Sequence, residues 1–126
     1  MRSTPSPADL LAVVAEPTRL RIVNCLAAAP LFVSDLQTLL DLPQPTVSRH
    51  LKVLRGADIV RDTPIAQFVL YRLRRGTDPS GRLLNAIIDA VTHDESLKRE
   101  RLRAYDRSRN STRIRLSGTT GEEEAR

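Results

Sequence analysis

Apolar residues recur at helical spacing through the first quarter of the chain. A short apolar run predicts one helix over residues 8–15, and a second is expected over residues 17–28, where a proline suits the first turn. Within the second segment Leu20, Val23 and Ala27 lie three or four positions apart, the spacing of one helix face. This segment is therefore expected to turn that face toward a core.

The next apolar segment carries a helix-start signal. Ser34 and Gln37 have the spacing of a capping box, in which each side chain satisfies a free backbone N–H at the start of a helix. Leucines at positions 36, 39 and 40 supply an apolar side. We expect a third, short helix that ends near Asp41.

A fourth helix is predicted after a very short link. Pro45 lies where this helix would begin, and Val47, Leu51 and Leu54 lie at positions i, i+4 and i+7 of one face. Gly and Asp at positions 56 and 58 favour its end. Two short helices joined by a tight turn predict a helix-turn-helix.

Two β-rich runs follow the fourth helix. Residues 59–61 and 68–73 have strand composition, and Asp62-Thr63-Pro64 between them predicts a turn. The pattern predicts a mainly α fold with a two-stranded β wing.

A last apolar stripe follows the wing. Asp78-Pro79 predicts the start of a fifth helix. The stripe consists of Leu83, Leu84, Ile87, Ile88 and Val91. It is too apolar for a lone surface helix, so we expect a partner surface.

Polar ends flank one predicted domain, residues 8–96. Residues 1–7 are rich in Ser and Pro and are expected to be disordered. Residues 97–107 predict a basic helix, and residues 108–126, rich in Ser, Thr and Gly with acids at the end, are expected to be a disordered tail. A chain of 126 residues accommodates one domain with such tails.

The distribution of charge points to a polyanionic partner. The net charge is +5, and the excess lies in residues 44–75, with seven basic and two acidic side chains, and in residues 97–116, with eight and two. Arg19 and Arg21 are expected to point outward from the second helix. Aromatic residues make up 3% of the chain, which leaves few platforms for stacking single-stranded bases and favours duplex DNA.

Composition also excludes several classes of protein. The single cysteine, Cys25, rules out a disulfide or a closed zinc site of several thiolates within one chain. No stretch approaches the roughly 20 apolar residues of a membrane span, so no membrane partner and a cytoplasmic location are expected. Neither histidine has a nucleophile and an orienting acid at a recognisable spacing, so we do not expect an enzyme.

The helix-turn-helix segment resembles a known family. The sequence Leu-Pro-Gln-Pro-Thr-Val-Ser-Arg-His-Leu-Lys-Val-Leu-Arg-Gly-Ala-Asp-Ile-Val, residues 42–60, is similar to the recognition helix and following strand of the ArsR/SmtB family of bacterial winged helix-turn-helix repressors. Residues 15–22 resemble the opening of that family's second helix, and residues 69–73 its second wing strand. The resemblance covers roughly residues 8–93.

The resemblance implies a recognition helix in the major groove of DNA. Its candidate DNA-binding residues are Gln44, Thr46, Ser48, Arg49, His50, Lys52, Arg55, Arg61 and Arg72. Arg49 is suited to bidentate contacts with guanine, whereas His50 has a structural alternative. The tip expected at residues 63–67 lacks the arginine and glycine common in the family, which leaves Arg61 and Arg72 as phosphate contacts beside it.

The basic segment 97–116 could add phosphate contacts, or it could form a solvated helix face and tail. The competing interpretation of the whole domain is a winged-helix protein-interaction module without specific DNA binding.

Pairing through the first and fifth helices is also implied by the resemblance. The expected dimer interface consists of Leu10, Leu11, Val14, Leu83, Leu84, Ile87, Ile88 and Val91. A two-fold homodimer would read an inverted-repeat operator, with one recognition helix on each half-site.

The usual sensor sites of the family are not matched here. Residues 31–36 lack the cysteine pair that holds thiophilic ions, and residues 78–80 and 91–94 lack the carboxylate and histidine pattern of the zinc, nickel and cobalt sensors. Asp89 and His93, one turn apart, are either a metal site at the dimer interface or, as we prefer, a helix-end cap or surface pair.

No cofactor is expected, and the effector, if there is one, is not identified by these residues. Cys25 has no second cysteine to pair with, so it is either a packed core thiol or a one-thiol switch.

Overall fold

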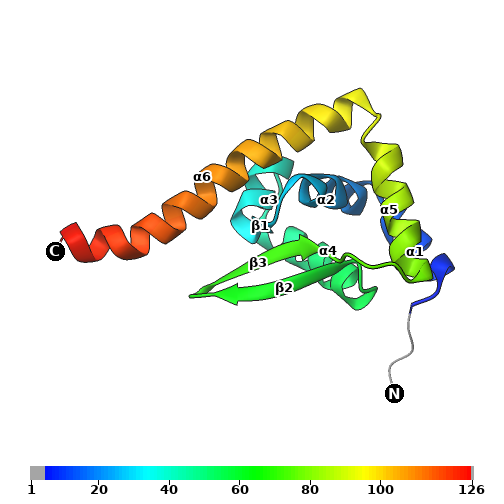
Figure 1. Cartoon of the computed structure of the whole chain (residues 1–126), viewed down its shortest axis with the longest axis horizontal. Coiled ribbons are helices and arrows are strands. Elements are labelled where there is room, and N and C mark those ends of the chain that lie inside the picture. Colours follow the sequence, from blue (N-terminus) through cyan, green and yellow to red (C-terminus); the bar gives the residue numbers. More distant parts are fainter. Residues whose placement is uncertain (1–4, 126) are drawn as a thin grey trace, which may run out of the picture.

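A helical body carries a β-hairpin along one side and a long helix across the other (Figure 1). The computed structural model describes residues 5–125, with side chains described for residues 5–111. The elements are α1 (Pro7–Val14), α2 (Pro17–Ala28), β1 (Leu31–Phe32), α3 (Val33–Leu40), α4 (Gln44–Gly56), β2 (Val60–Ile65), β3 (Phe68–Leu73), α5 (Pro79–Val91) and α6 (Glu95–Ala125). Within residues 5–125, no helix is long and apolar enough to cross a bilayer. The predicted mainly α fold with a β wing is confirmed.

Helix α2 is the centre of the core. Five consecutive residues, Ile22 to Leu26, are buried on all sides of the helix. A helix can be buried all round only if other elements enclose it. Helices α1, α3, α4, α5 and α6 and strand β3 all contact it. Its face at Arg19 and Arg21, predicted to point outward, is therefore partly covered.

The start of α1 corrects the expected disorder of residues 1–7. Ser6 caps the helix: its Oγ accepts from the Asp9 backbone N–H at 3.2 Å, and the Asp9 carboxylate accepts from the Ser6 backbone N–H at 3.1 Å. This reciprocal pair satisfies two free donors at the helix start and orders the chain from that point. Residues 1–4 lie outside the described part of the chain.

The start of α3 differs from the predicted capping box at Ser34 and Gln37. The cap lies two residues earlier, at Phe32, and Asp35 Oδ2 accepts from the Phe32 backbone N–H at 2.9 Å. Asp35 is 1% exposed, and its other oxygen accepts from Arg107 Nε at 3.0 Å. The predicted cap was wrong because it rested on local spacing alone. The carboxylate that caps the helix belongs to Asp35, and the distant Arg107 stabilises it.

The wing is longer than predicted, and its turn lies elsewhere. Strand β2 runs through residues 62–64, the expected turn, and pairs with β3 in the register Asp62 to Tyr71 and Pro64 to Val69. The strand order is β1-β3-β2, so β2 is an edge strand, the place in a sheet where proline is tolerated. The actual connection is Ala66 and Gln67, with Ala66 at φ 55°.

Strand β1 was not predicted. Its two residues, Leu31 and Phe32, pair with Tyr71 and Leu70 and make the sheet three-stranded. Both are buried. Two residues are too short to show a strand periodicity.

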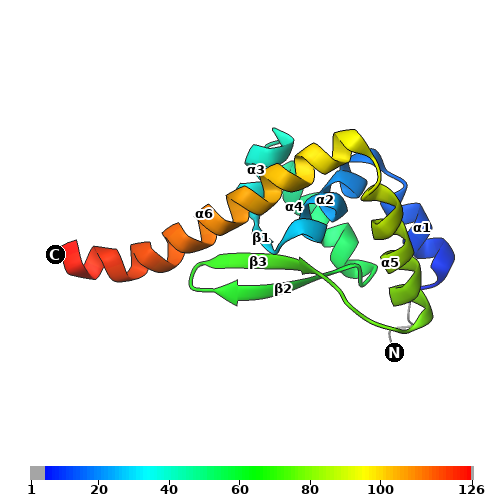
Figure 2. The ribbon, with the colours of Figure 1, turned by 45° about the horizontal axis from the view of Figure 1, so that its top comes forward.

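Helix α6 corrects the expected end at residue 107. It begins at Glu95 and continues to Ala125, so the segment expected to be disordered from residue 108 is helical (Figure 2). Ser108 is buried, and its Oγ donates to the Pro30 carbonyl at 2.9 Å. Composition predicted a free polar tail from residue 108, but Ser108 has its partner in the chain that follows α2.

Three residues of the expected dimer interface are core residues instead. Leu10, Val14 and Leu84 are 2%, 5% and 0% exposed within one chain. Helices α1 and α5 pack against each other and against α2, and this packing buries their inner sides. Leu11 is 48% exposed, and Leu83, Ile87, Ile88 and Val91 are half-buried, so these five remain available at the surface.

Two glycine substitutions are expected to change stability in opposite directions. A Cβ on Gly81, in the first turns of α5, would lie 2.5 Å from the Gly76 carbonyl oxygen. Because that neighbour is backbone, Gly81→Ala should destabilise the chain by roughly 1–3 kcal/mol. A Cβ on Gly56 meets nothing within 4 Å. Gly56→Ala should stabilise the chain by roughly 0.5–1 kcal/mol because alanine restricts the unfolded chain.

Denaturant unfolding of both variants measures this difference. A Gly81→Ala protein as stable as the original chain would contradict the close packing of α5 on the loop that contains Gly76, and a loss of stability in Gly56→Ala would contradict the open space around Gly56.

Candidate nucleic-acid interface

Helices α3 and α4 form the predicted helix-turn-helix. The chain leaves α3 at Asp41, which adopts a left-handed conformation with φ 54°, and the Leu42 backbone N–H donates to the Gln37 carbonyl at 3.1 Å. Pro43 then precedes the first turn of α4. This link gives α4 a fixed direction relative to α3.

The two faces of α4 have opposite chemistry. Val47, Leu51 and Leu54 are each 0% exposed, so the predicted buried stripe is confirmed. Arg49 lies on the opposite side of the helix, since 3.6 residues per turn place it roughly half a turn from that stripe. An amphipathic helix anchored in this way presents its polar face with little freedom to tilt.

The candidate residues of α4 lie around the exposed side. Gln44, Arg49, Lys52 and Arg55 are exposed, and Thr46, Ser48 and His50 are half-buried. Gln44 Nε2 donates to Ser48 Oγ at 2.7 Å, which orients the amide in the first turn of the helix.

Two of the cations on α4 are without an acidic partner. Within residues 5–111, Arg49 and Lys52 form no ion pair, whereas Arg55 Nη1 lies 2.9 Å from Asp62 Oδ2 on β2. An unpaired guanidinium can bind the edge of guanine or a phosphate without first breaking a contact. The Arg55–Asp62 pair instead ties α4 to the wing.

His50 lies between α4 and the start of α2. Its Nδ1 is 3.4 Å from Arg19 Nη1 and 3.9 Å from Glu16 Oε2. The Arg19 backbone N–H donates to Glu16 at 2.8 Å, and this bond holds the pKa of Glu16 below its ordinary value. This geometry favours the structural interpretation of His50.

Arg61 and Arg72 face each other across the wing. They are paired residues of β2 and β3, and both are exposed. Arg61 Nε lies 3.3 Å from Asp58 Oδ1, whereas Arg72 has no ion pair within residues 5–111. Like charges directly opposite each other destabilise a hairpin. A phosphate between them would remove that repulsion, so the pair is suited to a polyanion.

Replacement of Arg72 separates DNA binding from stability. Arg72→Ala should leave the hairpin as stable or slightly more stable, because it relieves the repulsion with Arg61. It should weaken binding to every duplex and reduce the slope of log K against log salt by about 1, the loss of one phosphate contact. Titrations at several salt concentrations measure the slope, and an unchanged slope would place Arg72 away from DNA.

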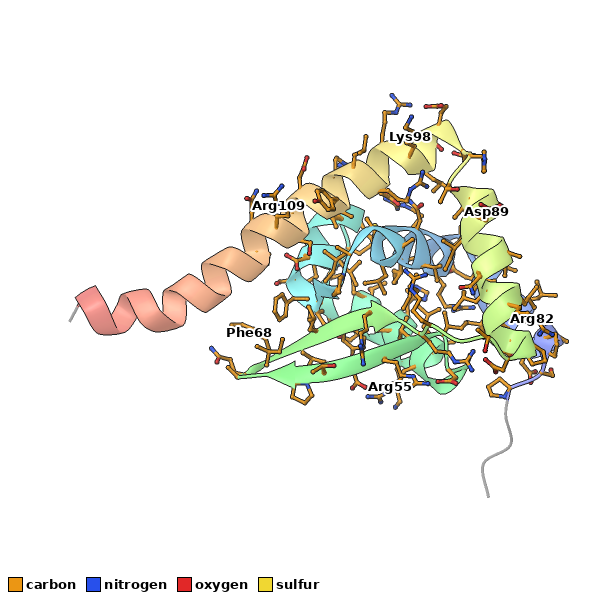
Figure 3. All side chains as sticks on the ribbon, in the orientation of Figure 1. Arg55, Phe68, Arg82, Asp89, Lys98 and Arg109 are labelled. Carbon is orange, nitrogen blue, oxygen red and sulfur yellow. The ribbon has the colours of Figure 1, made fainter. Side chains whose placement is uncertain are left out.

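The basic segment 97–116 binds its own chain through several arginines. Arg101 donates to Asn24 Oδ1 at 2.8 Å and to the carbonyls at the end of α5. Arg107 binds Asp35, and Arg103 Nη2 donates to the Leu39 carbonyl at 3.4 Å. Figure 3 shows Lys98 and Arg109 on the outer side of α6, away from α2. Much of this positive charge therefore holds α6 in place.

Asp89 and His93 have the geometry of a helix end. His93 Nδ1 lies 2.9 Å from the Asp89 carbonyl oxygen at the last turn of α5. Among the described residues, no three His, Cys, Asp or Glu side chains gather at one point. The preferred interpretation, a helix-end contact, accounts for this pair.

Cys25 is buried beneath α6. It is 0% exposed, and burial together with the nearby carboxylate of Glu100 raises the pKa of its thiol to about 12. Glu100 is itself held by Arg21, whose Nη2 donates to it at 2.7 Å. A protonated, enclosed thiol is a poor nucleophile, which favours a packing role over a redox switch.

Stability should fall at alkaline pH because of this thiol. Below about pH 9 the thiol is protonated in both the folded and the unfolded chain, so its effect is constant. Between pH 9 and about 12 only the unfolded chain ionises, and the free energy of unfolding should fall by up to about 1.4 kcal/mol per pH unit. Cys25→Ala should show a shallower decline in denaturant unfolding over that range. Equal slopes for the two proteins would contradict the raised pKa.

Val53 belongs to the exposed surface of α4, although no sequence pattern indicated it. This residue of α4 is 39% exposed on the same side as Arg49. Apolar residues were assigned to the core, yet Val53 falls outside the stripe of Val47, Leu51 and Leu54. An exposed aliphatic group there is suited to a thymine methyl group.

Comparison with known proteins identifies the family of this chain. Residues 16–62 match the family described as bacterial regulatory protein, arsR family. The chain is 38% identical over 85 residues to the HTH-type transcriptional repressor SmtB of Mycobacterium tuberculosis, a match that covers 68% of this chain and 59% of the relative. It is 40% identical over 80 residues to the biofilm growth-associated repressor of Agrobacterium fabrum, covering 64% of this chain and 67% of that protein.

A solved structure shows the same fold. Reduced HlyU from Vibrio cholerae superposes with a TM-score of 0.58 at 30% identity, over 68% of this chain and 83% of that one. The chain thus spans about three fifths of the length of the SmtB relative, and the family match over residues 16–62 includes α2, α3, α4 and the start of β2. The protein belongs to the ArsR/SmtB family of winged helix-turn-helix bacterial regulators.

Proposed function

We propose that this chain is a sequence-specific, duplex-DNA-binding transcriptional repressor that acts as a homodimer. The observation that carries the proposal is the outer face of α4, where Arg49 and Lys52 are exposed, opposite a fully buried stripe, and form no ion pair with the residues 5–111 whose side chains are described. A helix of this kind fits the major groove, with its first turns at the base edges. The family relatives, described as repressors, support the same function.

The dimer surface that we propose combines α1 and α5. These helices lie side by side at one end of the molecule (Figure 2). Leu11 is 48% exposed there, and the half-buried side chains Leu83, Ile87, Ile88 and Val91 lie on α5. Pairing across this surface would present two copies of α4 to an inverted-repeat operator.

Repression would follow from occupancy of that operator, and an effector would act by favouring a dimer geometry that fits DNA poorly. Because such an operator would lie on chromosomal DNA, we expect the protein to act in the cytoplasm. Catalysis is not part of the proposal, because His50 packs against α2 and His93 lies at the end of α5.

A fluorescence-anisotropy titration tests the proposal. The purified chain is titrated against duplex DNA from the region upstream of its own gene and against a scrambled duplex, each at two salt concentrations. We expect tighter binding to the upstream duplex and weaker binding to both at higher salt. Weak binding of equal affinity to the upstream and the scrambled duplex would favour a protein-interaction module instead.

A further inference from the structure

An open hollow of about 450 Å³ lies between the start of α3, the start of α4 and the tip of the wing. Small-molecule sites typically have volumes in this range, roughly 300–1,000 Å³. Figure 3 shows Phe68 near the free end of the hairpin, on the wing side of this hollow. We name the hollow the wing pocket, lined by residues 32–34, 37, 44 and 67–69.

Two aromatic rings form part of its wall. The centroids of Phe32 and Phe68 are 5.9 Å apart, and the ring planes meet at 70°. Phe32 is 3% exposed and fixed in the core, whereas Phe68 belongs to the hairpin and is half-buried. Phe68 is the more exposed of the two rings, so it is the aromatic surface on which a flat apolar molecule can pack.

The polar groups of the wing pocket are uncharged. Gln37, Gln44 and Gln67 each bring an amide that can donate and accept hydrogen bonds, and Ser34 adds a hydroxyl. Among the lining residues that the structure describes, none carries a charge, in contrast to the outer face of α4 with Arg49 and Lys52. A phosphate would therefore lack a counter-charge in this pocket, whereas a neutral molecule with polar edges could form hydrogen bonds with these amides.

We propose that the wing pocket binds an uncharged aromatic or heteroaromatic molecule, and that this molecule and duplex DNA exclude each other. Gln44 links the two sites: its amide lines the pocket and also lies in the first turn of the recognition helix. A ligand that binds this amide and the tip of the wing would contact both α4 and the hairpin, the two elements proposed to bind DNA. The exclusion rests on the proposed function, whereas binding of the molecule does not.

Nile red, a neutral planar dye whose emission rises in apolar surroundings, is a suitable probe. We expect a saturable rise in emission with the full chain. Gln67→Trp fills the pocket from an exposed position and should weaken dye binding at least about tenfold. Thr63→Trp is the matched control, because Thr63 is exposed on the same hairpin and does not line the pocket. It should bind the dye like the original chain.

Addition of the upstream duplex should then release the dye from the original chain. A dye affinity that is the same in Gln67→Trp and Thr63→Trp would overturn the site. The exclusion would be overturned if Gln67→Trp loses dye binding but a duplex that binds the original chain does not release the dye from it. If no duplex binds the chain, the repressor function is refuted, and the dye titration still tests whether the wing pocket binds the dye. Circular dichroism checks that both tryptophan variants are folded.

Discussion

Arg49→Ala should weaken binding to the upstream duplex by roughly 5- to 150-fold, the equivalent of 1–3 kcal/mol for a good bidentate contact with a base. The guanidinium is exposed, unpaired within residues 5–111 and opposite the buried stripe of α4. Its loss removes a base contact and leaves the fold intact, because the side chain packs on nothing in the core. Preference for the upstream duplex over the scrambled one should fall by a similar factor.

Arg99→Ala is the matched control for this prediction. Arg99 is also exposed, but it lies on α6, across the body from the wing. It loses the same charge, so any general effect of net charge on DNA affinity appears in both variants. Equal losses in the two proteins, measured by anisotropy at one salt concentration, would remove Arg49 from the base-reading surface.

Asn24→Ala should destabilise the chain by roughly 2–4 kcal/mol, because it removes both hydrogen bonds of a fully buried amide, one of them to a charged guanidinium. Asn24 is 0% exposed; its Nδ2 donates to the Leu97 carbonyl at 2.9 Å, and its Oδ1 accepts from Arg101 at 2.8 Å. Both contacts join α2 to α6. Loss of this amide should therefore loosen α6 as well as lower the midpoint of denaturant unfolding.

Asn85→Ala makes the same substitution at an exposed position of α5. Its amide lies 3.5 Å from the Gly76 carbonyl, at the limit of a hydrogen bond. A change within about 0.5 kcal/mol is expected there. Trypsin cleavage in α6 provides a second measurement, because α6 is rich in arginine and should be cut faster in Asn24→Ala. Similar stability of the two variants would show that Asn24 does not hold α6.

Local patterns predicted much of the fold and part of the candidate interface. The stripe of Val47, Leu51 and Leu54 defined both the buried and the exposed side of α4, because helical periodicity alone assigns the faces. Pro17 and Pro79 lie in the first turns of α2 and α5, where their fixed backbone angle suits a helix start. These features depend on neighbours within a few residues.

The errors concern partners that are distant in sequence. The turn of the wing was placed at Pro64 because proline usually interrupts a strand, yet β2 is an edge strand and tolerates it. Asp35 was not recognised as the residue that binds the start of α3, because its second partner, Arg107, lies 72 residues away. The contacts of α6 with α2 could not be predicted for the same reason, since their partners are also more than 70 residues apart in the sequence.

The sequence by itself determined the helix-turn-helix, the wing strand β3 and the family, because each depends on short-range spacing or on a contiguous motif. Only the tertiary structure decided that the basic segment after residue 97 packs on α2 and α3 and that Leu10, Val14 and Leu84 are core residues. It also decided that, among the side chains described, Arg55 has an acidic partner and Arg49 has none. The physical reason is that an ion pair or a buried contact depends on which surfaces meet, and that is set by packing between elements and not by the residue types within one of them.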